Sequence, residues 1–144
     1  MPRLVPPALA ALFFLSGCAG SETVVGGAVV DPLMALRGKI WIVEDIDRGG
    51  IIDMSRVTIE IDGANRAAGR ASCNRWFAAV AATEAGIAFG QAGTSRMACA
   101  EALMNQEQRF LATLARVRSF GIDATGALLL SGEDGAYLKA YPES

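Results

Sequence analysis

The sequence predicts a mainly β domain (α+β by strict count), built as a small curled antiparallel sheet or barrel of seven to eight strands with one amphipathic helix. Residues 39–141 fall into short apolar runs that are separated by turn residues. Within them, residues 57–61 alternate strictly between apolar and polar, and only residues 100–118 repeat apolar side chains at helical spacing. Many short strands with short connections and one helix are typical of such folds.

The first predicted strand spans residues 39–46. It places Trp41 and Val43 on one face and Ile40 and Ile42 on the other. Apolar residues on both faces predict a strand that is buried on both sides or lies at a barrel end. A loop over residues 47–53 follows.

The alternating strand over residues 57–61 is the clearest half-buried strand of the chain. A turn at residues 62–63 leads into a partner strand over residues 66–72, in which Gly69 indicates a bulge or a close approach of two backbones. Residues 76–82 and 87–89 are predicted to form a further hairpin.

The predicted helix lies between Ala100 and Arg118, and its apolar stripe is expected to cover one opening or face of the sheet. Glu101 near its start and Arg116 near its end have the signs that the helix dipole favours, and Gly121 is the expected stop. The stripe consists of Leu103, Met104, Phe110, Leu111, Leu114 and Val117. Three further strands are predicted over residues 119–123, 127–131 and 136–141.

The N-terminus predicts export. Arg3 precedes an apolar run over residues 4–15, and the small pair Ser16-Gly17 is followed by Cys18, as in a bacterial lipobox. Residues 1–17 are therefore predicted to be a lipoprotein signal peptide, and Cys18 to carry the lipid that anchors the protein. The alternative is an ordinary secretory signal with a chance cysteine.

Residues 18–35 are small and glycine-rich without periodicity, which predicts a flexible tether, and residues 36–142 are then the folded domain. The residue after the anchor is Ala19 rather than aspartate, which resembles sorting to the outer membrane, facing the periplasm.

Composition narrows the classes of function. Without Arg3, 12 of the 13 basic residues remain against 15 acidic ones, and no basic block is present, which argues against a nucleic-acid partner. The chain has no histidine, which excludes Ser-His-Asp and Cys-His catalysis and histidine-held zinc or haem. The absence of histidine removes the commonest general base at neutral pH, although enzymes that use carboxylate pairs or Ser-Lys need none. We expect a protein that is not an enzyme and has no cofactor.

Cys73 and Cys99 remain once Cys18 carries lipid, and an oxidising compartment favours a disulfide between them. Two free thiols are the alternative, with Arg75 or Arg96 available to lower the pKa of one. A bond would bring Asn74, Arg75 and Arg96 together as a possible binding patch, although Asn74 and Arg75 could equally satisfy backbone groups where the sheet bends.

Four carboxylates surround one loop, and oxygen ligands of this kind could hold calcium. They are Glu44, Asp45, Asp47 and Asp53. Their spacing fits no EF-hand, so a solvated acidic loop and no metal site are expected. Met97 is expected to pack inward.

Several segments together resemble the META domain family, the HslJ-like group of heat-shock-related bacterial envelope lipoproteins. These are Gly38–Trp41, Glu44–Ile46, Gly50–Asp53, Gly69–Asn74, Met97–Cys99, Glu107, Phe110, Leu111 and Leu114. Ser72 departs from the family's usual glycine and Ser95 from its usual threonine.

The resemblance implies a lipocalin-like fold with one helix, no established catalytic activity, and a connection with envelope stress and antibiotic tolerance. The leading hypothesis is a non-enzymatic, lipid-anchored envelope protein that contributes to envelope integrity or stress tolerance by binding an unknown envelope protein. The alternative is a lipocalin-like carrier of a small apolar ligand. A carboxylate-based glycan hydrolase is the weakest hypothesis.

Overall fold

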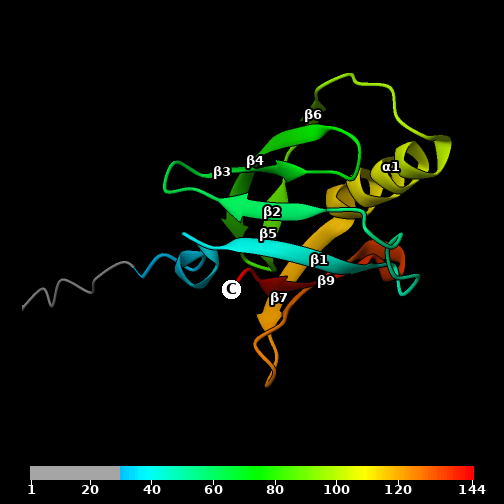
Figure 1. Cartoon of the computed structure of the whole chain (residues 1–144). Helices are drawn as coiled ribbons and strands as arrows, with labels where there is room; N and C mark the ends of the chain where they lie inside the picture. The colour runs from blue at the N-terminus through cyan, green and yellow to red at the C-terminus, as the bar shows by residue number, and fades with distance from the viewer. Residues whose placement is uncertain (1–29) are drawn as a thin grey trace, which may run out of the picture.

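The computed structural model describes residues 30–144, which form a nine-stranded antiparallel sheet and the helix α1 (Glu101–Arg116) (Figure 1). The strands are β1 (Ile40–Ile46), β2 (Thr58–Ile61), β3 (Arg66–Arg70), β4 (Arg75–Thr83), β5 (Gly86–Phe89), β6 (Gly93–Thr94), β7 (Val117–Ile122), β8 (Leu128–Gly132) and β9 (Tyr137–Pro142). Two short 3-10 turns, η1 (Met34–Leu36) and η2 (Glu133–Gly135), complete the described elements. The predicted fold class is confirmed, and the additional strand is β6, whose two residues are too few to show alternation.

The sheet curls until its end strands β5 and β7 lie close to each other without pairing. Its strand order is β5-β4-β3-β2-β1-β9-β8-β7, and β6 pairs with β4 beyond the stretch that β5 occupies. Gly86 of β5 lies so close to β7 that a Cβ atom there would be 3.1 Å from the Cα atom of Ser119. The result is a nearly closed barrel.

Only the inner face of β1 is buried. Trp41 and Val43 point into the core, and a register shift between Val43 and Asp45 turns Ile46 inward as well. Ile40 is 37 % exposed, so the prediction of a strand buried on both sides is wrong at this residue. The reason is that α1 and η1 lie at the openings of the barrel, and the outer side of β1 stays open to solvent (Figure 1).

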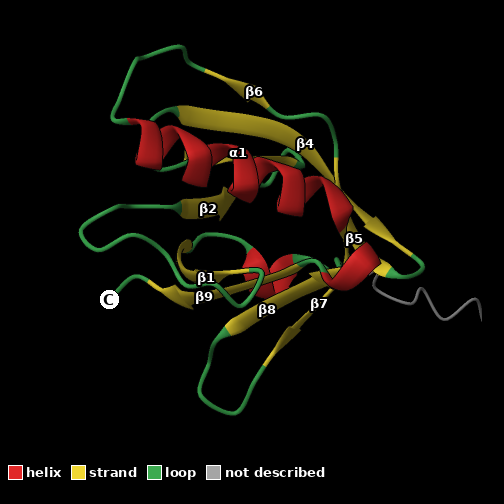
Figure 2. Ribbon diagram, turned by 90° about the vertical axis from the view of Figure 1, so that its right-hand side faces the viewer, coloured by secondary structure: helices red, strands yellow, loops and turns green. Residues whose placement is uncertain are grey.

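One opening is covered by α1, which contacts β1, β5 and β9 (Figure 2). The rings of Trp76 on β4 and Phe110 on α1 pack edge to face with centroids 5.5 Å apart. The helix ends at Arg116, and Val117 continues directly into β7 with an extended backbone. Gly121 therefore lies inside β7 and does not stop the helix as predicted.

The other opening is covered by η1 and the residues beside it. Leu33 and Leu36 are fully buried, and the Trp41 indole N–H donates to the Leu36 carbonyl over 3.0 Å. The Arg37 guanidinium binds the Asp31 carboxylate and the carbonyl of Asp62. The predicted tether is thus too long, because residues 31–35 belong to the packed domain; the rest of the predicted tether, the signal peptide and Cys18 lie outside the described residues.

Gly69 marks a close backbone approach, as its position in the predicted strand suggested. A Cβ atom there would lie 2.0 Å from the carbonyl oxygen of Thr58. That carbonyl accepts the indole N–H of Trp76 over 2.9 Å, and the Thr58 hydroxyl accepts the backbone N–H of Arg70 over 3.0 Å. The regular ladder between β2 and β3 is replaced here by these two side-chain bonds.

Candidate functional site

Cys73 and Cys99 form a disulfide, with their Cα atoms 5.9 Å apart and a sequence separation of 26. The bond ties the loop between β3 and β4 to the segment that enters α1. The predicted pairing is confirmed, and the free-thiol alternative is contradicted.

Asn74 is 6 % exposed, and both polar atoms of its side chain are hydrogen-bonded within the protein. Its Oδ1 accepts the Met97 backbone N–H over 2.6 Å and the Ser95 hydroxyl over 3.0 Å. Its Nδ2 donates to Oε1 of Glu107 over 3.0 Å, and its backbone N–H donates to Oε2 over 2.6 Å. Asn74 therefore positions the loop and is closed to a ligand, while Met97, 57 % exposed, does not pack inward as expected.

The helix binds the loops through buried polar residues that hydrophobic periodicity does not detect. Oε1 of Gln106 accepts the Ile52 backbone N–H over 2.7 Å, and its Nε2 donates to the Ser55 hydroxyl over 2.8 Å. The Thr113 hydroxyl lies 2.7 Å from Oδ2 of Asp47. Together with Glu107, these contacts fix α1 over its opening.

Two of the four carboxylates at the end of β1 and in the loop after it, Asp45 and Asp47, hold the local backbone. Asp47 also accepts the Tyr137 backbone N–H over 3.0 Å and a guanidinium N–H of Arg116 over 3.2 Å. Asp45 accepts the Gly50 backbone N–H over 3.1 Å. Between residues 30 and 144, no three acidic, cysteine or histidine side chains gather as metal ligands would.

Replacing Asn74 with alanine is expected to lower the free energy of unfolding by about 2–3 kcal/mol, because the buried Glu107 carboxylate loses a donor and the Met97 N–H loses its acceptor. Asn74→Asp should cost more at neutral pH, because two carboxylates would then face each other. Urea unfolding measures both changes. The exposed Arg96→Ala is the control, expected within about 0.5 kcal/mol of the parent; equal effects at the two positions would contradict this role of Asn74.

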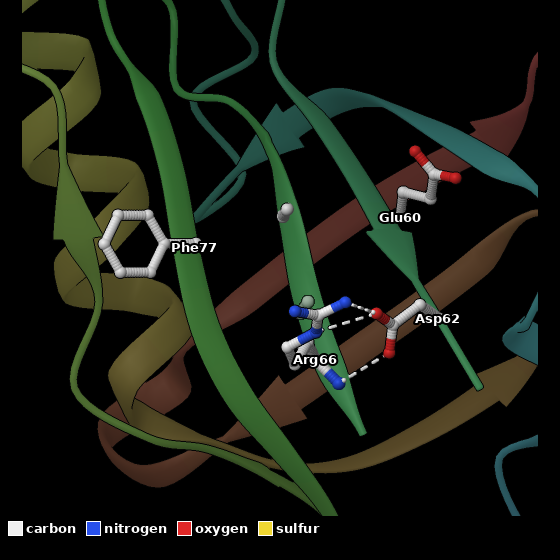
Figure 3. A pocket seen from close by; sticks show the side chains of 6 residues that line it. Glu60, Asp62, Arg66 and Phe77 are labelled. Atoms are coloured by element: carbon white, nitrogen blue, oxygen red, sulfur yellow. Dashed lines mark hydrogen bonds and ion pairs between the residues drawn. The ribbon is translucent and has the colours of Figure 1, made fainter. Parts of the chain in front are cut away.

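The open surface lies on the outer side of β1–β4, where two adjoining grooves of about 480 and 360 Å³ share lining residues. Cross-strand pairing places Ile40, Glu60, Ala68 and Phe77 in one row. We call these four residues the outer row. Phe77 is 63 % exposed, an unusual position for an aromatic ring. Figure 3 shows the smaller groove, with Phe77 and Glu60 on opposite sides of it.

The arginines around these grooves differ in their partners. Arg66 is engaged by Asp62, whose pKa is lowered by the backbone N–H of Arg66 and by its guanidinium (Figure 3). Arg56 pairs with Glu143. Within residues 30–144, Arg70 and Arg75 have neither an ion pair nor a side-chain hydrogen bond, although both line the larger groove.

The predicted patch is therefore divided. Arg75 lines the larger groove, Asn74 is buried behind it, and Arg96 is exposed but does not line either outer-row groove. The sequence missed the outer row and Arg70, because their proximity depends on strand register. Cationic, acidic and apolar groups on one open face are suited to holding a ligand.

The family model of the META domain matches residues 34–144. An NMR structure of a protein from Burkholderia xenovorans is similar, with a TM-score of 0.61 and 18 % identity over 97 % of this chain and 99 % of that one. A second NMR structure has a TM-score of 0.60 and 17 % identity over 78 % of this chain and 94 % of that one. These likenesses show the fold.

A search of curated proteins found no match. None of the helices in the described part of the chain is long and apolar enough to cross a bilayer. The match over residues 34–144 shows that the chain belongs to the META domain family.

Proposed function

We propose that this chain is a lipid-anchored protein of the bacterial cell envelope that acts by non-covalent binding through the outer side of β1–β4, and not by catalysis. The observation that carries the proposal is an uncovered sheet face with an exposed phenylalanine and two arginines that have no partner among the described residues. Exposed aromatic and arginine side chains are enriched at binding sites. Support of envelope integrity under stress is the role that the resemblance to HslJ-like lipoproteins favours.

Binding on the outside is favoured over the lipocalin-like carrier alternative. The interior is occupied by large side chains, among them Trp41, Trp76 and Phe110, each no more than 1 % exposed. An apolar ligand inside the barrel would have to displace this packing, which costs several kcal/mol. The outer row needs no such rearrangement. The hydrolase alternative is weaker still, because Asp45 and Asp47 are engaged in hydrogen bonds with the backbone.

Replacing Cys18 with alanine is expected to move the protein from the membrane fraction to the soluble fraction, because alanine cannot carry the acyl chains that are proposed to anchor it. Membrane fractionation followed by immunoblotting measures the shift. A sucrose gradient of the parent protein should place it with the outer membrane. Retention of Cys18→Ala in the membrane fraction would contradict the lipid anchor.

Binding at the outer row is tested in living cells with a photoreactive benzoylphenylalanine in place of Phe77. A light-dependent adduct is expected at this position. The control is the same residue in place of Glu84, which is exposed on the turn between β4 and β5 and lies outside both grooves. Adducts at position 84 and none at position 77 would contradict the proposed surface.

A further inference from the structure

Arg70 and Arg75 are two cations side by side on the outer face, and neither forms an ion pair within residues 30–144. The two residues are directly opposite in the register of β3 and β4. Both are exposed, and side chains so placed have Cβ atoms about 4.5–5.5 Å apart, a separation at which like charges destabilise a sheet.

The other arginines of the domain show how unusual this is. Most of them bind a carboxylate, a carbonyl or an aromatic ring: Arg37, Arg48, Arg56, Arg66, Arg109, Arg116 and Arg118. Within residues 30–144, Arg96 also lacks a partner, but it is not paired across strands with another cation. Among these residues Arg70 and Arg75 form no ion pair, although Glu60 lines the same groove, and each has a neighbour of the same sign.

The backbone beneath the pair is fixed. The Arg75 backbone N–H donates to the Ser95 hydroxyl over 3.1 Å, and the Arg75 carbonyl accepts the Ser95 backbone N–H over 3.0 Å. The Arg70 backbone N–H is held by Thr58, as described above. Rigid strands present two guanidinium groups without a cost of ordering loops on binding.

We propose that Arg70 and Arg75 bind the phosphate of a phosphate monoester whose apolar or aromatic body lies along the outer row. Two guanidinium groups match the charge of about −2 that a phosphate monoester carries near pH 7, and their planar donors suit phosphate oxygens. Ala68, Phe77 and Ile40 provide apolar surface in the same groove of about 480 Å³. The inference rests on the proposed function and names the ligand class of its surface.

The probe is phenyl phosphate, titrated by calorimetry into the full mature chain purified from membranes in a nonionic detergent. Phenyl phosphate is expected to bind at least about tenfold more tightly than inorganic phosphate, benzoate or phenyl glucoside, each of which lacks one part of the match. Arg70→Gln and Arg75→Gln should each weaken binding about tenfold or more. Arg96→Gln is the matched control and should leave binding unchanged.

A second readout does not depend on calorimetry. Without ligand, Arg75→Gln should unfold at a higher temperature than the parent, because the like-charge repulsion is gone. At the same concentration, phenyl phosphate should raise the unfolding temperature of the parent and of Arg96→Gln more than that of Arg75→Gln.

Three results would overturn the inference: binding that survives both substitutions, equal binding of phenyl glucoside, or equal binding of benzoate. If phenyl phosphate does not bind while the photoreactive residue at position 77 still gives its adduct, the outer face remains the binding surface and only the assignment of a phosphate ligand is wrong. If phenyl phosphate does not bind and no adduct forms, the proposed function is wrong as well.

Discussion

Replacing Gly69 with alanine is expected to lower the free energy of unfolding by about 3 kcal/mol or more. The new Cβ atom would lie 2.0 Å from the Thr58 carbonyl oxygen and 2.7 Å from its carbon, which are backbone atoms. Relief requires β2 and β3 to separate. Separation would also break the bond from the Trp76 indole to the same carbonyl, leaving a buried donor without its partner.

Gly121→Ala is the matched control, because Gly121 also lies within a strand but has no atom within 4 Å of the place that a Cβ atom would take. Alanine there should leave stability unchanged or raise it by up to about 1 kcal/mol, because glycine weakens strands. Urea unfolding of the two variants measures the difference. Similar stabilities for Gly69→Ala and Gly121→Ala would contradict the close approach of β2 and β3.

Removing the disulfide with the double substitution of Cys73 and Cys99 by alanine is expected to cost about 3–4 kcal/mol. A cross-link over 26 positions restricts the unfolded chain, and the closed loop contains β4, β5 and β6. The bond also holds the segment from which Asn74 reaches Glu107, so its loss should loosen the hydrogen bonds beneath α1.

Chemical denaturation with and without a reducing agent measures this contribution. Reduction should destabilise the parent by about the same amount as the double substitution. The reducing agent should leave the double variant unaffected, which separates loss of the bond from any effect of the alanines. A parent protein with the same unfolding midpoint in both conditions would contradict a stabilising disulfide.

Local pattern was sufficient for most of the fold. Alternation over residues 57–61 corresponds to β2, and Gly69 correctly indicated two backbones in close approach. Two cysteines in a chain with a predicted export signal were enough to predict the pairing of Cys73 with Cys99. Each of these signals is contained within a few residues or in a simple count.

The polar underside of α1 was not predictable in the same way. Periodicity registers apolar side chains, whereas Gln106, Glu107 and Thr113 are buried because loops far along the chain supply their partners. Glu107 meets Asn74 across 33 positions, and Thr113 meets Asp47 across 66. Nothing near these residues in the sequence reveals those partners.

The backbone conformation of Ser72 and its contact with the helix are visible only in the structure. Its φ angle of 83° is in the left-handed region, which glycine adopts without strain. The serine hydroxyl accepts Nε2 of Gln106 over 3.2 Å, a contact that glycine cannot make. Ser72 therefore combines a bond to the helix with a strained backbone.

The outer row could not be predicted without knowing the register in which β1, β2, β3 and β4 pair. Ala68 is unremarkable in the sequence, and only its pairing with Glu60 and Phe77 places it in the middle of a groove. The predicted patch, by contrast, joined residues near the two cysteines, and burial of Asn74 removes it from the surface.

The most direct test of binding on the outer face is native mass spectrometry of the protein purified from its own envelope. The parent is expected to carry a mass beyond its lipid modification. Ala68→Gln, which fills the middle of the outer row, should lose that mass. Ala79→Gln, an equally outward alanine on β4 that lines neither outer-row groove, should keep it. Retention of the additional mass by Ala68→Gln would contradict the account.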